Sequence, residues 1–172
     1  MKILVTLDGS RESEAILPAI VGLAKASSAT LTLLTVHHPA EGSYPRPADP
    51  VYPVETGSQI EVESREMPLP SAPEPYESEE DAIQRVRGEQ TDYLQGLAAP
   101  LRAEGLAVAT QVDFSNEPAK AIVSMASRGG FDLIAMSTHG RSGLSALIQG
   151  SVSSEVIRSG IAPVVLVRPR GA

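Results

Sequence analysis

The sequence contains no cysteine in its 172 residues. This absence excludes thiol catalysis, CxxC redox chemistry, zinc-thiolate sites and iron–sulfur clusters. Long apolar runs are also missing, because none approaches the roughly 18 residues that a membrane helix requires. The first residues, MKILVTLDGS, hold a single lysine and a short apolar run before an aspartate, which is unlike a signal peptide. We therefore expect a soluble, cytoplasmic protein with no membrane partner.

Positive charge is scarce, and the formal net charge of −7 argues against nucleic acid as a partner. The acidity is concentrated in residues 39–81, where eleven carboxylates and two arginines give a net charge of −9, so the rest of the chain sums to +2. That segment also holds nine of the fourteen prolines. We predict one domain over residues 1–172, with a Pro-rich acidic insertion at about 39–77. A solvated loop is the simplest interpretation of the insertion, and a partner-binding loop or lid is the alternative.

Outside the insertion, short β-rich runs alternate with segments of helical periodicity. The predicted strands are residues 2–7, 30–36, 107–114, 132–137 and 162–169, and the predicted helices are residues 11–27, 78–105, 116–130 and 151–160. Asn116 marks the start of the third helix, Gly129 and Gly130 mark its end, and Ser151 is a cap for the fourth. Because strand–helix–strand units make parallel strands, the pattern predicts an α/β fold. We expect a single doubly wound, Rossmann-like domain with a five-stranded parallel sheet of order 3-2-1-4-5.

The segment MSTHGRSGLSALIQGSV, residues 136–152, follows the fourth predicted strand. In doubly wound sheets, ligands bind outside the carboxyl ends of the strands, where the strand order reverses. Gly140 and Gly150 lack the Cβ atom that would hold a phosphate away, and Ser151 adds a hydroxyl at a helix start. The chain has no Walker A, G-x-G-x-x-G or G-x-S-x-G motif. The segment therefore predicts a phosphate cradle of a different kind.

Three stretches together resemble the universal stress protein family, in its ATP-binding branch. They are ILVTLDGSRESEAIL, LLTVHHP and DLIAMSTHGRSGLSALIQGSVSSEVIRSGIAPVVLVRP. The family's nucleotide signature is G-x2-G-x9-G followed by Ser or Thr, and Gly140, Gly150 and Ser151 match it. Ser137 stands where the family has its first glycine. The resemblance implies a stress-response protein that binds adenine nucleotide and acts as a nucleotide-dependent regulator or sensor.

The resemblance also implies the residues that bind the nucleotide. Asp8 lies beside the ribose and adenine, the backbone of Val36 reads the adenine edge, and Met136 packs on the base. The complete expected set is Asp8, Val36, Met136, Ser137, His139, Gly140, Arg141, Gly150, Ser151 and Val152. The expected cofactor is ATP, with AMP or ADP as alternatives and Mg as an accompanying ion. The resemblance further implies a homodimer, in which the last strand, here Val164 to Val167, pairs with that of a second copy.

The residues alone leave other roles open. Asp8 also fits a cap for the first helix. His37 and His38 lack a third ligand, so we expect no metal site. Asp8 and His139 lack a serine on a recognisable nucleophile turn, so we expect no catalytic residues. A slow ATPase or phosphotransferase and a nucleotide-free interaction module are the alternative functions, and the protein partners are unknown.

Overall fold

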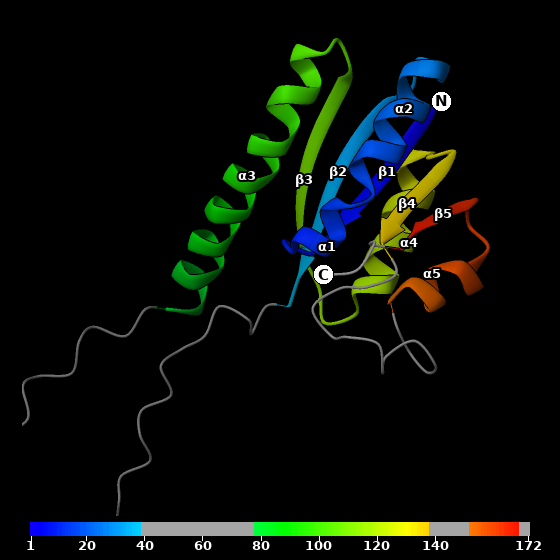
Figure 1. Cartoon of the computed structure of the whole chain (residues 1–172). Helices are drawn as coiled ribbons and strands as arrows, with labels where there is room; N and C mark the ends of the chain where they lie inside the picture. The colour runs from blue at the N-terminus through cyan, green and yellow to red at the C-terminus, as the bar shows by residue number, and fades with distance from the viewer. Residues whose placement is uncertain (39–77, 138–151, 169–172) are drawn as a thin grey trace, which may run out of the picture.

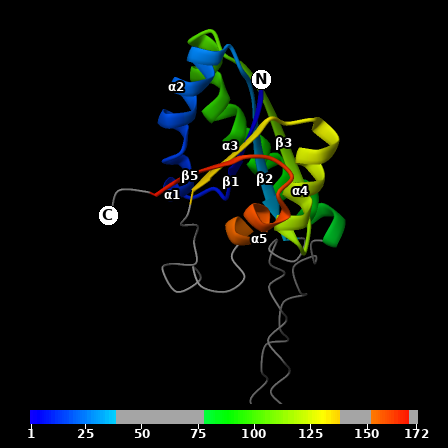
Figure 2. The same cartoon turned by 90° about the vertical axis from the view of Figure 1, so that its right-hand side faces the viewer.

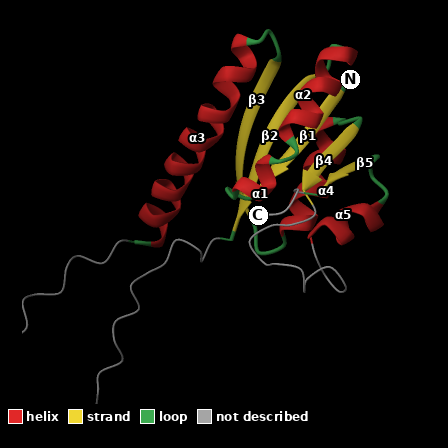
Figure 3. Cartoon of the chain, viewed as in Figure 1, coloured by secondary structure: helices red, strands yellow, loops and turns green. Residues whose placement is uncertain are grey.

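The computed structural model describes residues 1–38, 78–137 and 152–168, in which strands and helices alternate (Figures 1 and 3). The elements in chain order are β1 (Lys2–Leu7), α1 (Arg11–Glu14), α2 (Leu17–Ser27), β2 (Thr30–His37), α3 (Glu79–Ala103), β3 (Ala107–Phe114), α4 (Pro118–Gly129), β4 (Leu133–Ser137), α5 (Val152–Ser159) and β5 (Val164–Val167). The predicted strands are therefore confirmed, and the last one is shorter than expected.

The five strands form one parallel sheet in the order β3-β2-β1-β4-β5. β1 lies at its centre and pairs along its whole length with β2, from Lys2 opposite Thr30 to Leu7 opposite Thr35. On its other side β1 pairs with β4. A central parallel strand is covered on both faces, which agrees with the nearly continuous apolar run of β1. The predicted fold class and strand order are confirmed.

Helices cover both faces of the sheet, with α2 and α3 on one side and α4 and α5 on the other (Figure 2). Ile3 and Val5 of β1 belong to the first core and Leu4 to the second, because successive side chains of a strand point to opposite faces. All three are 0% exposed, and burial of each contributes about 1.5–3 kcal/mol. Because the strands are parallel, their carboxyl ends lie together at one edge of the sheet. The two cores hold the strands in this arrangement.

The first helical segment is interrupted, so the prediction of one helix over residues 11–27 is wrong. α1 ends at Glu14 and α2 begins at Leu17, with Pro18 in its first turn. Proline has no N–H to donate to the carbonyl four residues earlier, and its ring crowds that carbonyl. Ile16 lies at the junction and is 0% exposed. The interruption therefore leaves α1 as a single short turn of helix beside the end of β1.

The boundaries of the later helices follow local residue chemistry. α4 begins at Pro118 with Glu117 as its N-cap, rather than at Asn116, because proline is favoured at the first helical position. It ends as predicted, with Gly130 in the left-handed conformation at φ 59°. Two other predictions, the Ser151 cap of α5 and the insertion at about 39–77, lie outside the described residues. In the described parts of the chain, no helix is long and apolar enough to cross a membrane.

Candidate functional site

The strand order reverses at β1, because the chain moves from β1 to β2 on one side and later returns to β4 on the other. The helices that follow β1 lie on one face of the sheet and α5, which follows β4, lies on the opposite face (Figure 2). In open α/β sheets this is the point where ligands bind. The structure thus brings together the carboxyl ends of β1, β2 and β4, where Asp8, Val36 and Ser137 lie.

The turn after β1 holds the carboxylate of Asp8 in a defined position. Its Oδ1 accepts hydrogen bonds from the Ser10 backbone N at 3.0 Å and from the Ser10 hydroxyl at 2.5 Å. Gly9 adopts φ 79°, a left-handed conformation that favours glycine. The N-cap of α1 is Ser10, whose hydroxyl accepts from the Ser13 N at 3.1 Å. The suggestion that Asp8 caps this helix is therefore wrong, because Asp8 orients the capping serine instead.

A hydrogen bond also joins α1 to α3. The Tyr93 hydroxyl donates to Glu14 Oε1 at 3.0 Å, although the two residues are 79 positions apart. Burial is the largest cause that raises the pKa of Tyr93 above its ordinary value, and the hydrogen bond and negative charge of Glu14 add to it. Neither the role of Ser10 nor this pair was predicted from the sequence. The Asp-Gly-Ser sequence could have indicated that Ser10 caps α1. No sequence pattern connects Glu14 with Tyr93.

Val36 lies past the end of β1, since the pairing of β1 with β2 stops at Leu7 and Thr35. It is still paired with Asp113 of β3. Among the described residues, Val36 therefore has no partner strand on its β1 side, and this is the side that faces the reversal of strand order. A backbone in this position can offer its polar groups to a planar ligand at the edge of the sheet.

The end of β2 also carries polar side chains on the face toward α3. The Thr35 side chain is 0% exposed, and its hydroxyl has no hydrogen-bond partner within the described residues. The His37 ring lies 6.2 Å from that of Phe114, which in turn lies 4.8 Å from the Arg87 guanidinium carbon. In the described ranges no three His, Cys, Asp or Glu residues gather as a metal-binding group. His37 contributes to packing at this edge.

β4 brings Met136 and Ser137 to the same edge. The Met136 side chain is 4% exposed and packs in the core beneath α4 and α5. Ser137 is half-buried and stands opposite Val167 of β5. Val152, half-buried, is the first residue of α5. The first turn of a helix has unpaired N–H groups and favours anions, so the start of α5 suits a phosphate group.

The remaining predicted nucleotide-binding residues lie outside the described residues. They are His139, Gly140, Arg141, Gly150 and Ser151. The described residues on either side, Ser137 and Val152, fix where this segment leaves the sheet and where it joins α5. The predicted roles of these residues, and of Asp8, Val36 and Met136 toward a nucleotide, stay predictions.

Comparison with known proteins identifies the relatives of this chain. The Universal stress protein family matches residues 1–168. The universal stress protein YxiE of Bacillus subtilis (strain 168) is 30% identical over 167 residues, which cover 97% of this chain and 98% of that protein.

Solved structures show the same fold. A universal stress protein in complex with cAMP superposes with a TM-score of 0.62 at 18% identity, covering 98% of this chain and 96% of that chain. A universal stress protein family protein from Arabidopsis thaliana with AMP bound superposes with a TM-score of 0.59 at 13% identity, covering 99% of this chain and 93% of that chain. The match of the family to nearly the whole sequence and the agreement in fold lead to one conclusion: the chain belongs to the universal stress protein family.

Proposed function

We propose that this protein binds an adenine nucleotide at the carboxyl ends of β1, β2 and β4, and that occupancy by the nucleotide regulates its action in a stress response. The observation that carries the proposal is the position of the reversal point, at the carboxyl ends of β1 and β4, where Asp8 and Ser137 lie. Two structures of the same fold hold cAMP and AMP, which supports an adenine ligand. ATP is the ligand that the signature favours, with AMP and ADP as alternatives.

In this proposal each residue has a distinct role. The carboxylate of Asp8, oriented by Ser10, accepts a hydrogen bond from the ribose, and the backbone of Val36 reads the adenine edge. Met136 packs against the base, and Ser137, His139 and Gly140 line the path from ribose to phosphates. The amides of Gly150, Ser151 and Val152 and the Ser151 hydroxyl donate to the phosphates, with Arg141 as a further contact. Mg would accompany the phosphates, and slow ATP hydrolysis remains an alternative that labelled ATP would detect.

The nucleotide carried by the purified protein tests this function. Freshly purified protein is denatured, and the released small molecules are separated by chromatography. We expect an adenine nucleotide from the unmodified protein and none from the Gly140→Val, Gly150→Val double variant, because added side chains occupy the space of the phosphates. If the unmodified protein releases no nucleotide and added ATP does not raise its thermal unfolding temperature, the proposal is wrong.

We also propose that the protein forms a homodimer through β5, Val164–Val167. β5 is the edge strand next to β4, so one of its sides can accept another strand. Leu166 of β5 is 38% exposed and Ile157 of α5 is 46% exposed. An exposed apolar edge strand favours pairing with a second copy, because pairing satisfies its backbone groups and covers its apolar side chains.

A further inference from the structure

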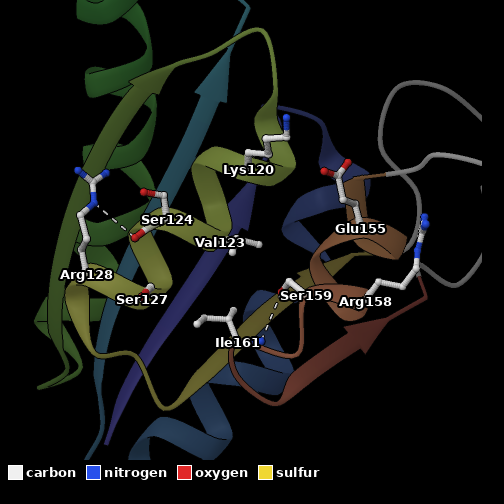
Figure 4. A pocket seen from close by; sticks show the side chains of 9 residues that line it. All are labelled: Lys120, Val123, Ser124, Ser127, Arg128, Glu155, Arg158, Ser159 and Ile161. Atoms are coloured by element: carbon white, nitrogen blue, oxygen red, sulfur yellow. Dashed lines mark hydrogen bonds between the residues drawn. The ribbon is translucent and has the colours of Figure 1, made fainter.

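A groove runs between α4 and α5, on the helical layer rather than at the ends of the strands (Figure 4). Its volume is about 600 Å³. The residues that line it are Lys120, Val123, Ser124, Ser127, Arg128, Glu155, Arg158, Ser159 and Ile161. None of the described residues assigned to the nucleotide is among them. The groove is therefore a separate feature of the molecule and does not depend on the proposed nucleotide site.

Two arginines stand on opposite sides of this groove, Arg128 on α4 and Arg158 on α5 (Figure 4). Each donates from Nε to a carbonyl of its own helix, Arg128 to Ser124 at 3.4 Å and Arg158 to Ser154 at 3.3 Å. Within the described ranges, neither guanidinium forms a salt bridge with a carboxylate. Both side chains therefore keep most of their donors available for an anion.

The third cation of the groove differs from the two arginines. Lys120 forms a salt bridge with Glu117, and this hydrogen bond is the largest cause that raises its pKa. The charge of Glu155 at the same end of the groove raises the pKa of Lys120 further. The positive charge that lacks a carboxylate partner is therefore that of Arg128 and Arg158.

The surface between the two arginines is apolar and bordered by hydroxyl groups. Val123 and Ile161 lie between the arginines (Figure 4), and Ile161 is 40% exposed. The Ser159 hydroxyl is already engaged, since it donates to the Val156 carbonyl at 2.6 Å and accepts from the Ile161 N at 3.4 Å. An occupant would therefore place an apolar group over Val123 and Ile161 and acidic groups toward the arginines.

We propose that this groove docks an extended acidic segment of a partner protein, with an apolar residue between two carboxylates. Arginine binds carboxylates through paired N–H donors, and arginine clusters are a recurring means of recognising acidic motifs. Charge complementarity supports this occupant: the described part of the chain holds thirteen carboxylate residues against ten Lys and Arg residues. The groove lining, in contrast, holds two arginines without a carboxylate partner among the described residues and one carboxylate, Glu155, besides Lys120 with its partner Glu117. A small anion fits less well, because small-molecule sites enclose most of their ligand and this groove is open to solvent.

Binding of a labelled peptide to the full chain tests the proposal. The probe is a fluorescent peptide with Glu-Val-Glu between Gly-Ser flanks, and its counterpart carries Gln-Val-Gln. We expect the glutamate peptide to bind, its affinity to fall with added salt, and the counterpart to bind at least about tenfold more weakly. Arg128→Glu and Arg158→Glu should each weaken binding about tenfold or more. Arg85→Glu, which makes the same charge change on α3, should leave it unchanged.

Four results would overturn the proposal. The first is equal binding of the two peptides, and the second is equal loss of binding in the groove variants and in Arg85→Glu. The third is a change from dimer to monomer in Arg128→Glu or Arg158→Glu, which would mean that a second copy of this chain occupies the groove. Both arginines are exposed, so the variants should fold, and thermal unfolding confirms this before binding is measured. The fourth is displacement of the peptide by inorganic phosphate at constant ionic strength, which would indicate a small-anion site instead.

Discussion

At the scale of single residues, Ser10 connects the end of β1 to the start of α1. It donates to Asp8 through both its backbone and its hydroxyl, and the same hydroxyl caps α1 at the Ser13 N. The other end of α1 is held by the Glu14 carboxylate, which accepts from Tyr93 of α3. This series of contacts links the residue proposed to bind the ribose with the helix that follows the acidic insertion.

The contact between Glu14 and Tyr93 gives a prediction for stability. Tyr93→Phe removes the donor and should lower the free energy of unfolding by about 1 kcal/mol, since the bond is partly exposed to water. Urea unfolding near neutral pH measures this change. Arg85→Glu, which alters a surface pair on the same helix, provides the comparison and should cost less. A Tyr93→Phe variant as stable as the unmodified protein would show that the hydrogen bond contributes nothing.

The raised pKa of Tyr93 adds a pH dependence. Folding favours the neutral phenol, so the stabilisation is fully present below the unfolded pKa of about 10 and is lost as the pH rises toward the higher folded pKa. Between about pH 10 and about pH 12, the unmodified protein should therefore lose more stability than Tyr93→Phe. The measurement is the difference between the two unfolding free energies at each pH. Parallel curves for the two proteins would contradict the assignment.

At the scale of elements, two glycines should respond in opposite directions to the same substitution. Gly9 lies at φ 79° in the turn after β1, where alanine costs about 1–2 kcal/mol. Gly88 lies inside α3, and a Cβ there would meet nothing within 4 Å. Gly88→Ala should therefore stabilise the protein by about 0.5–1 kcal/mol. Thermal unfolding of the two variants measures both effects, and a stabilising Gly9→Ala would mean that the turn differs from the one described.

The elements were largely predictable from sequence, because apolar periodicity and the strand–helix alternation indicate the layers. The strand order was an expectation for a doubly wound sheet, since the same alternation also occurs with other orders. The interruption after α1 was missed because the apolar spacing continues through Ile16 and Ile20, while Pro18 decides where helical bonding restarts. The position of Asp8 at the reversal point followed from the order of the strands. Its orientation by Ser10 and the contact from Tyr93 depend on tertiary geometry, which residue patterns do not contain.

At the scale of the whole molecule, the edge strand β5 leads to a prediction about assembly. Leu166→Lys should convert the proposed dimer to a monomer, because a charged side chain on an edge strand opposes pairing with another strand. Leu23→Lys is the matched control, since Leu23 on α2 and Leu166 are both 38% exposed. Light scattering coupled to gel filtration measures the mass. A dimer that persists in Leu166→Lys, or that is lost equally in Leu23→Lys, would contradict pairing through β5.

The central claim is that an adenine nucleotide binds where the strand order reverses, and calorimetric titration of ATP into nucleotide-free protein tests it most directly. We predict saturable binding of ATP with a dissociation constant on the order of micromolar, and much weaker binding of GTP. The Gly140→Val, Gly150→Val variant should lose binding, whereas Gly88→Ala, a glycine substitution on α3, should retain it. Absence of ATP binding to the unmodified protein, or equal binding to the double variant, would contradict the account.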